Sequence, residues 1–154
     1  VKSNYDTDIF LKLITSIEKI SGLKYKKNSQ IDIAFRVIAD HVRAVSFSIA
    51  DGQLPSNNGA GYVIRRILRR AIRYGYSFLD LNKPFIFLLV DELSNQMGEF
   101  YPELHNQKDL IKKIIKDEEK AFLKTLKKGL VLLDSLINSS KKNIISWEKV
   151  FKIT

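Results

Sequence analysis

The fold centres on residues 31–50, IDIAFRVIADHVRAVSFSIA, a stretch in which apolar side chains cover most of a helical circumference. A helix at a protein surface has a single apolar stripe, so this breadth predicts a helix in the middle of a core. Apolar residues recur at helical spacing through nearly all of the remaining chain, and no segment has a convincing strand pattern. We therefore expect an all-α protein: a helical bundle of about five to six helices, with one long helix near the C-terminal end.

Glycine and capping residues set the expected ends of the helices. The predicted helices span about residues 9–21, 31–50, 60–74, 84–97 and 106–137, and a last one begins after Ser146. Glycine ends three of them, at Gly22, Gly75 and Gly98. Residues 99–105 are expected to form a turn. At about 1.5 Å per residue the helix at 106–137 would be roughly 45 Å long, so part of it should project or brace a neighbour.

The composition is that of a folded, basic protein. The 154 residues are 45% hydrophobic and 28% charged, which suits one domain with a packed core. The net charge of +9 and the isoelectric point near 9.7 favour a polyanionic partner, nucleic acid first and an acidic membrane surface second. The absence of cysteine fits a reducing compartment. No run approaches the ~18 apolar residues of a membrane span, and no signal-peptide pattern is present.

Arginine is concentrated in one predicted helix. The chain has 19 lysines and only seven arginines, and five of the seven lie between residues 65 and 73. A guanidinium group is rigid and planar and matches phosphate oxygens, so the cluster favours nucleic-acid binding over solubility alone. Helical spacing sorts the five into two rows beside the apolar stripe, Arg65, Arg69 and Arg73 in one row and Arg66 and Arg70 in the other. The alternative for any single arginine is that it braces an internal carboxylate.

A polar loop, residues 51–61, precedes the arginine helix and contains the adjacent amides Asn57 and Asn58. The minor groove of A-form RNA is wide and shallow and displays base edges and 2′-hydroxyls. An amide oxygen could accept a hydrogen bond from a guanine amino group there. We therefore take both asparagines as candidate RNA contacts. The alternative is that Asn-Asn-Gly forms an ordinary turn.

Other chemistry-bearing residues do not form a catalytic or metal-binding pattern. His41 and His105 have no second histidine or cysteine at ligand spacing, so we expect no metal site, and we interpret His41 as a hydrogen-bonded core or interface residue. Residues 59–61 lack the full glycine pattern of a phosphate loop. The paired carboxylates at 91–92 and 117–119 are expected on solvated helix faces. Nothing in the segment indicates a catalyst.

Two motifs in order resemble alanyl-tRNA synthetases. Residues 36–44 are RVIADHVRA, and residues 51–71 are DGQLPSNNGAGYVIRRILRRA. The first ten residues also resemble the chain just after that family's class II catalytic core, and residues 112–136 resemble its long downstream helix. The resemblance covers essentially all of residues 1–154. It implies a single helical tRNA-recognition domain from the middle of a longer polypeptide. This agrees with the ends of the sequence: it starts at Val1 without Met and stops at Thr154, and we interpret both ends as cuts in a longer chain.

The resemblance implies what the segment recognises. Members of this family join alanine to tRNA through an ATP-dependent alanyl-adenylate, and they identify tRNA(Ala) mainly by a G·U wobble pair in its acceptor stem. The family's asparagine that contacts this pair falls on Asn57. The backbone of the stem would be held by Arg65, Arg66, Arg69, Arg70 and Arg73. The expected partners are therefore the tRNA(Ala) acceptor stem and the catalytic domain of the same polypeptide, in the cytoplasm and with no membrane.

The resemblance also implies what the segment lacks. The family's acidic partner to the asparagine is expected at or just past Thr154. The ATP- and alanine-binding motifs, the editing domain with its zinc ligands and the C-terminal oligomerisation region match no part of the chain. We therefore expect no cofactor in this segment, ATP with magnesium in the parent enzyme, and no aminoacylation by the segment alone.

Two alternative functions remain at this point. The first is a non-enzymatic basic helical module that binds structured RNA by charge alone. The second is a surface on the long lysine-rich helix that binds a membrane or a partner helix.

Overall fold

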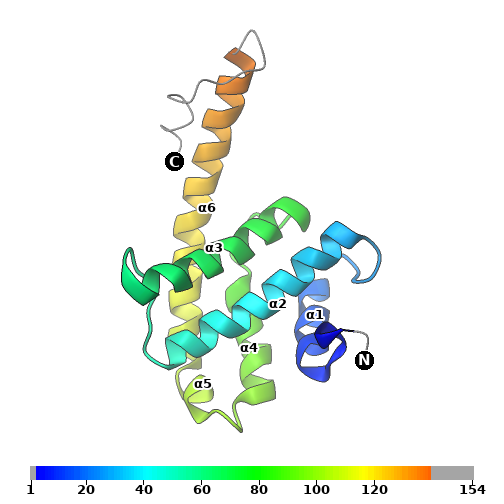
Figure 1. Ribbon diagram of the computed structural model, residues 1–154, viewed down its shortest axis with the longest axis vertical. Helices are drawn as coiled ribbons and strands as arrows, with labels where there is room; N and C mark the ends of the chain where they lie inside the picture. Colours follow the sequence, from blue (N-terminus) through cyan, green and yellow to red (C-terminus); the bar gives the residue numbers. More distant parts are fainter. Residues whose placement is uncertain (1–2, 140–154) are drawn as a thin grey trace.

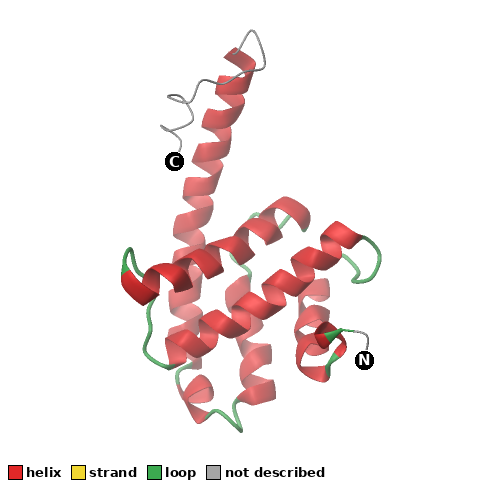
Figure 2. Ribbon diagram, viewed as in Figure 1, coloured by secondary structure: helices red, strands yellow, loops and turns green. Residues whose placement is uncertain are grey.

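The computed structural model describes residues 3–139. Within this range the chain contains one 3-10 turn and six α-helices and no strand, which confirms the predicted all-α class (Figures 1 and 2). The elements in chain order are η1 (Asn4–Asp6), α1 (Asp8–Ser21), α2 (Ser29–Ala50), α3 (Gly59–Phe78), α4 (Ile86–Met97), α5 (Pro102–Asn106) and α6 (Lys108–Ser139).

Helix α2 is the centre of the fold, as its sequence predicts. Asn28 caps its N-terminus, since the side-chain Oδ1 accepts from the backbone N–H groups of Gln30 and Ile31 at 2.9 and 3.3 Å. The helix lies along α3 and also packs against α1, α4 and α5 (Figure 1). Its buried residues are Ala34, Phe35, Ile38, Ala39, Val42, Val45, Ser46, Ile49 and Ala50. Helix α3 is thus held by a broad apolar surface along one side.

A buried carboxylate fixes helix α6 to helix α4. Glu119 is completely buried and accepts hydrogen bonds from the backbone N–H groups of Phe85, Ile86 and Phe87 at 2.9, 2.9 and 3.2 Å. The first N–H groups of a helix have no acceptor within that helix, so Glu119 caps α4 from a different element. The expectation that residues 117–119 form a solvated acidic face is therefore wrong at Glu119. Its carboxylate is buried because the start of α4 requires acceptors.

The C-terminal half of α6 projects beyond the other helices (Figure 1). Ile111, Ile115 and Leu123 in the first half are buried in the core, whereas Val131 and Leu132 are 68% and 51% exposed. This division agrees with the expectation that a helix of such length extends past the bundle. The anchored half places its residues opposite α3, which determines the functional site described below.

Helix α3 continues through its predicted end at Gly75 to Phe78. Gly75 is buried, and a Cβ atom added there would overlap the ring of Phe85. The glycine is therefore needed for close packing inside a helix and not for a left-handed cap. Gly22, in contrast, has φ of +73° and ends α1 as predicted.

The remaining differences concern the connections. Pro102 begins the short helix α5 where a turn was expected, because its fixed φ suits a first helical turn and the buried Leu104 anchors the segment. Helix α6 begins two residues later than predicted and is described as far as Ser139. The helix predicted after Ser146 lies outside the described residues. Among the helices that are described, none combines the length and the apolar character needed to cross a membrane.

Candidate nucleic-acid interface

The polar loop before α3 is packed tightly onto the first turn of that helix. The Ser56 backbone N–H donates to the Gly61 carbonyl at 3.0 Å, and the Ser56 hydroxyl donates to the Asn58 carbonyl at 2.7 Å. Gly61 is buried, and a Cβ there would collide with Ser56 and with the Leu54 carbonyl oxygen. The loop therefore has a defined shape that holds the exposed Asn57 and Asn58 beside the arginine helix.

A groove of about 530 Å³ runs between α3 and α6 on the side of the arginine cluster. Its lining residues are Arg66, Arg69, Arg70, Arg73, Tyr74, Phe78 and Phe122. Four of the five arginines predicted as RNA contacts therefore line one surface. Within residues 3–139, none of these four forms an ion pair with a carboxylate. Four uncompensated positive charges repel one another, and an anion in the groove would relieve that repulsion.

Aromatic rings hold the guanidinium groups in place. The Arg69 guanidinium lies 5.2 Å from the centre of the Phe122 ring, and the Arg70 group lies 5.7 Å from the centre of Tyr74. Arg66 is placed in the same way at 5.7 Å from Tyr62. Such contacts orient a cation without neutralising it, so the charges stay available to a ligand.

Sequence reasoning missed these rings. Tyr62, Arg66, Arg70 and Tyr74 follow one another at intervals of four residues, so this row of two arginines between two tyrosines was visible in the sequence. Phe122 lies far from Arg69 in the sequence, and only the packing of α6 against α3 brings the two together.

Arg65 differs from the other four arginines because it is bound inside the protein. Its side chain is only 18% exposed, and Nη2 donates to Glu118 Oε1 at 2.7 Å. Nη1 donates to the side-chain Oδ1 of Asn57. The alternative of internal bracing thus applies to Arg65, and the expectation of a solvated carboxylate is wrong at Glu118.

The two asparagines lie in different local settings. Asn57 is exposed, with its oxygen turned toward Arg65. Asn58 is exposed at the N-cap position of α3, where its side chain makes no capping hydrogen bond. Both amides are therefore on the surface, and Asn57 is linked to α3 through Arg65, one turn before the groove residue Arg69.

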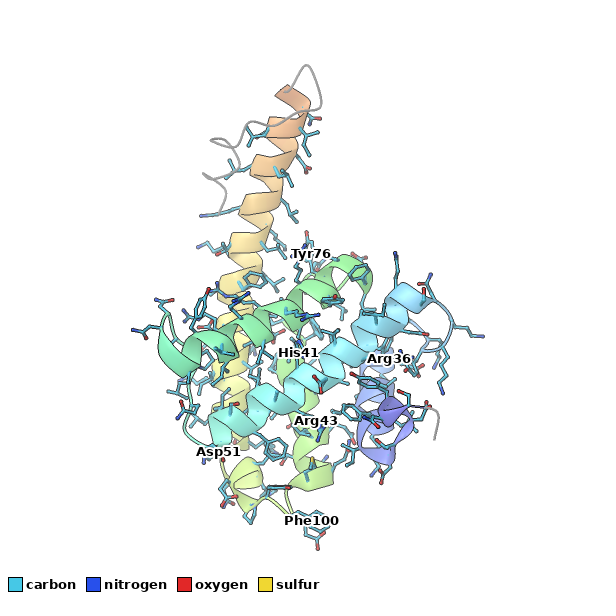
Figure 3. The ribbon with its side chains drawn as sticks, in the orientation of Figure 1. Arg36, His41, Arg43, Asp51, Tyr76 and Phe100 are labelled. Carbon is cyan, nitrogen blue, oxygen red and sulfur yellow. The ribbon has the colours of Figure 1, made fainter. Side chains whose placement is uncertain are left out.

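The other candidates have structural partners. His41 lies in a hollow beside Arg66 and Arg70 (Figure 3), and its Nδ1 atom is 3.3 Å from Asp40 Oδ2. Burial lowers the pKa of His41, and the contact with Asp40 opposes this shift. His105 Nδ1 lies 3.3 Å from the Ser94 hydroxyl. In the described part of the chain, no group of three or more His, Cys, Asp or Glu side chains could hold a metal ion.

The two arginines outside the cluster lie on α2, away from the groove (Figure 3). Arg36 donates to the Tyr25 hydroxyl at 2.7 Å, and the Arg43 guanidinium lies 4.7 Å from the centre of the Phe10 ring. Both therefore connect α2 to the N-terminal part of the fold. Neither of them lines the groove.

The part of the chain that the structure describes is an all-α domain with a groove lined by four arginines, and comparison with known proteins identifies the class to which it belongs. Residues 1–154 match the family model described as tRNA synthetases class II (A), and the chain belongs to this family. The resemblance noted in the sequence is thereby confirmed.

The curated relatives are alanine–tRNA ligases. The chain is 59% identical over 152 residues to the alanine–tRNA ligase of Christiangramia forsetii, and the aligned region covers 99% of this chain and 18% of the relative. It is 54% identical over 160 residues to that of Flavobacterium psychrophilum, covering 98% and 18%. For Staphylococcus saprophyticus the identity is 46% over 155 residues, covering 99% and 18%. The chain thus spans less than a fifth of the length of these relatives.

Proposed function

We propose that this chain is the tRNA acceptor-stem recognition domain of an alanine–tRNA ligase. The observation that supports this most directly is the groove between α3 and α6, whose four arginines form no ion pair with a carboxylate among residues 3–139, together with the closely packed loop before α3 and its exposed amides. The parent reaction attaches alanine to tRNA(Ala) through an ATP-dependent alanyl-adenylate. In this proposal the chain binds and orients the tRNA, and the activation of alanine takes place elsewhere in the parent polypeptide.

The arginines of the groove bind the phosphate backbone of the acceptor stem. Arg66, Arg70 and Arg73 are exposed, and Arg69 is half-buried over Phe122 with its Nε unpaired. The terminal nitrogens of a guanidinium group are charged donors, and their hydrogen bonds to phosphate oxygens are stronger than those between neutral groups. These contacts fix the position of the stem but are blind to its sequence.

Identity is read by the loop. Asn57 is exposed and contacts Arg65, one turn before the groove residue Arg69, so in this proposal a stem whose backbone lies on the groove arginines presents its shallow minor groove to the amide. In this arrangement Asn57 contacts the G·U wobble pair, and Asn58 lies next to it as a second contact. The phosphate contacts set the register in which that pair reaches Asn57.

The test compares two RNA hairpins that copy the acceptor stem, one with the G·U pair and one with G·C. We expect the full chain to prefer the G·U hairpin, and Asn57→Ala to remove about 1–3 kcal/mol of that preference. Fluorescence anisotropy titrations measure both affinities. Gln53→Ala, which truncates another exposed amide of the same loop, is the matched control and should keep the preference.

The competing function is RNA binding by charge alone, which the unpaired arginines also favour. That function predicts equal affinity for the two hairpins and no effect of Asn57→Ala beyond that of the control. Equal binding by the unaltered chain would therefore reject recognition of the wobble pair while leaving the groove as a general phosphate-binding surface.

A further inference from the structure

We infer that Glu118 and Arg65 are positioning residues that determine which end of the Asn57 amide faces the RNA. This inference rests on the proposed function, since it concerns how the recognition amide is presented. The contacts form a chain across three elements: Glu118 on α6, Arg65 on α3 and Asn57 in the loop. Glu118 and Asn57, the two ends of this chain of contacts, are far apart in the sequence, and only the tertiary fold brings both of them to Arg65.

The geometry specifies the orientation of the amide. A guanidinium group has donors and no acceptor, so only the oxygen of Asn57 can face Arg65. The Nδ2 group must then point away from Arg65. The two terminal nitrogens of Arg65 are used separately, Nη2 for Glu118 at 2.7 Å and Nη1 for Asn57. One residue thus connects a fixed carboxylate to a loop side chain.

Glu118 is itself held firmly. The next residue, Glu119, is completely buried as the cap of α4, and Phe122, one turn further along α6, packs under Arg69. Glu118 therefore cannot shift along or around the helix without breaking these contacts. With both partners only 18% exposed, the Glu118–Arg65 ion pair is less screened than one at an open surface.

The consequence is that Asn57 acts on the RNA as a donor. Its oxygen already accepts from a cation, and the adjacent positive charge disfavours a second donor such as a guanine amino group. The outward NH₂ group matches acceptors of the minor groove: purine N3, pyrimidine O2 and the ribose 2′-oxygen. This assignment differs from the acceptor role expected from the sequence. A donor at a fixed position distinguishes base pairs that place these acceptors differently, whereas a freely rotating amide does not.

The test uses the same two hairpins with variants of Glu118. One base contact of this kind corresponds to a preference of about 5- to 150-fold for the G·U hairpin. We expect Glu118→Ala to bring this ratio close to one without weakening the affinity for the G·C hairpin. Glu118→Gln keeps an acceptor for Arg65 and should retain most of the preference. Asp117→Ala removes the same charge from the neighbouring, exposed position and should change nothing.

Arg65→Lys is the second variant. It keeps the positive charge, but a single ammonium group cannot hold Glu118 and Asn57 in the same fork geometry, so the preference should again be lost. Circular dichroism and the unfolding midpoint establish that each variant is folded. A salt bridge that only joins α3 to α6 would lower the midpoint and leave the ratio of the two affinities unchanged.

The outcomes separate the two proposals. If the unaltered chain does not prefer the G·U hairpin, the proposed function fails and this inference fails with it. If it does prefer that hairpin and folded Glu118→Ala or Arg65→Lys keeps the full ratio, the positioning role alone is rejected. It is also rejected if Glu118→Gln loses as much preference as Glu118→Ala, because charge and not the hydrogen bond would then be responsible.

Discussion

Replacement of Glu119 by alanine is expected to destabilise the fold strongly. The change would leave the backbone N–H groups of Phe85, Ile86 and Phe87 without their acceptor, and the first two of these hydrogen bonds are fully buried. A buried donor left unsatisfied costs about 1–3 kcal/mol. Two such donors should lower the free energy of unfolding by about 2–6 kcal/mol. Water that enters the space left by the side chain would reduce this loss.

The same residue makes stability depend on pH. Burial raises the pKa of Glu119 to about 7, although its three backbone hydrogen bonds oppose the shift. Because the folded pKa lies above the unfolded value of 4.5, this contribution to stability is complete below pH 4.5 and is lost as the pH rises through 7. The difference corresponds to roughly 3 kcal/mol. Burial lowers the pKa of His41, which gives an opposite trend near neutrality, so the unaltered chain alone cannot isolate Glu119.

The measurement is urea unfolding between pH 4.5 and 8 of the unaltered chain, Glu119→Ala, Glu119→Gln and the neighbouring control Asp117→Ala. Glutamine is neutral throughout and keeps an oxygen for the Phe85 and Ile86 donors, so its stability should fall less with rising pH than that of the unaltered chain. If the unfolding free energies of the unaltered chain and of Glu119→Gln changed with pH in parallel, the raised pKa of the buried Glu119 carboxyl group would be refuted. A loss below about 1 kcal/mol in Glu119→Ala would refute the capping role.

Three further changes test separate parts of the structure. Arg70→Ala should weaken both hairpins alike and reduce the slope of log affinity against log salt by about one, as measured by anisotropy titrations at several salt concentrations. Gly75→Ala should cost about 1–3 kcal/mol in urea unfolding, because its methyl group would overlap the Phe85 ring; combined with Phe85→Leu it should cost less than the sum of the two single changes. Leu132→Lys, on the projecting part of α6, should alter the unfolding free energy by less than about 0.5 kcal/mol.

Local patterns in the sequence were sufficient for most of the fold. The apolar breadth of residues 31–50 predicted the central helix, and the left-handed cap at Gly22 ended α1 as expected. Gly75 shows where such reasoning fails. A glycine that ends a helix and a glycine that admits a ring from another segment look the same in sequence, and only the position of Phe85 distinguishes them.

The candidate site was predictable where its signal was local. The arginine cluster lies within nine residues, and the groove contains four of its members. The partners from α6 could not be found in this way, because 53 residues separate Arg65 from Glu118. Glu118 and Glu119 are adjacent acidic residues that sequence statistics place in solvent. One instead binds a guanidinium and the other a helix end, since successive residues of a helix point in directions about 100° apart.

The projecting half of α6 has a mechanical consequence. An α-helix is stiff along its axis, so a force applied near Leu132 is transmitted as a torque to the point where the helix is clamped. The clamped residues nearest the free arm are Phe122, which packs under Arg69, and the buried Leu123, one turn beyond Glu118 and Glu119. A force on the free arm would therefore reach the Phe122–Arg69 contact first and the Glu118–Arg65 ion pair next, so the arm is coupled mechanically to the arginine row of α3.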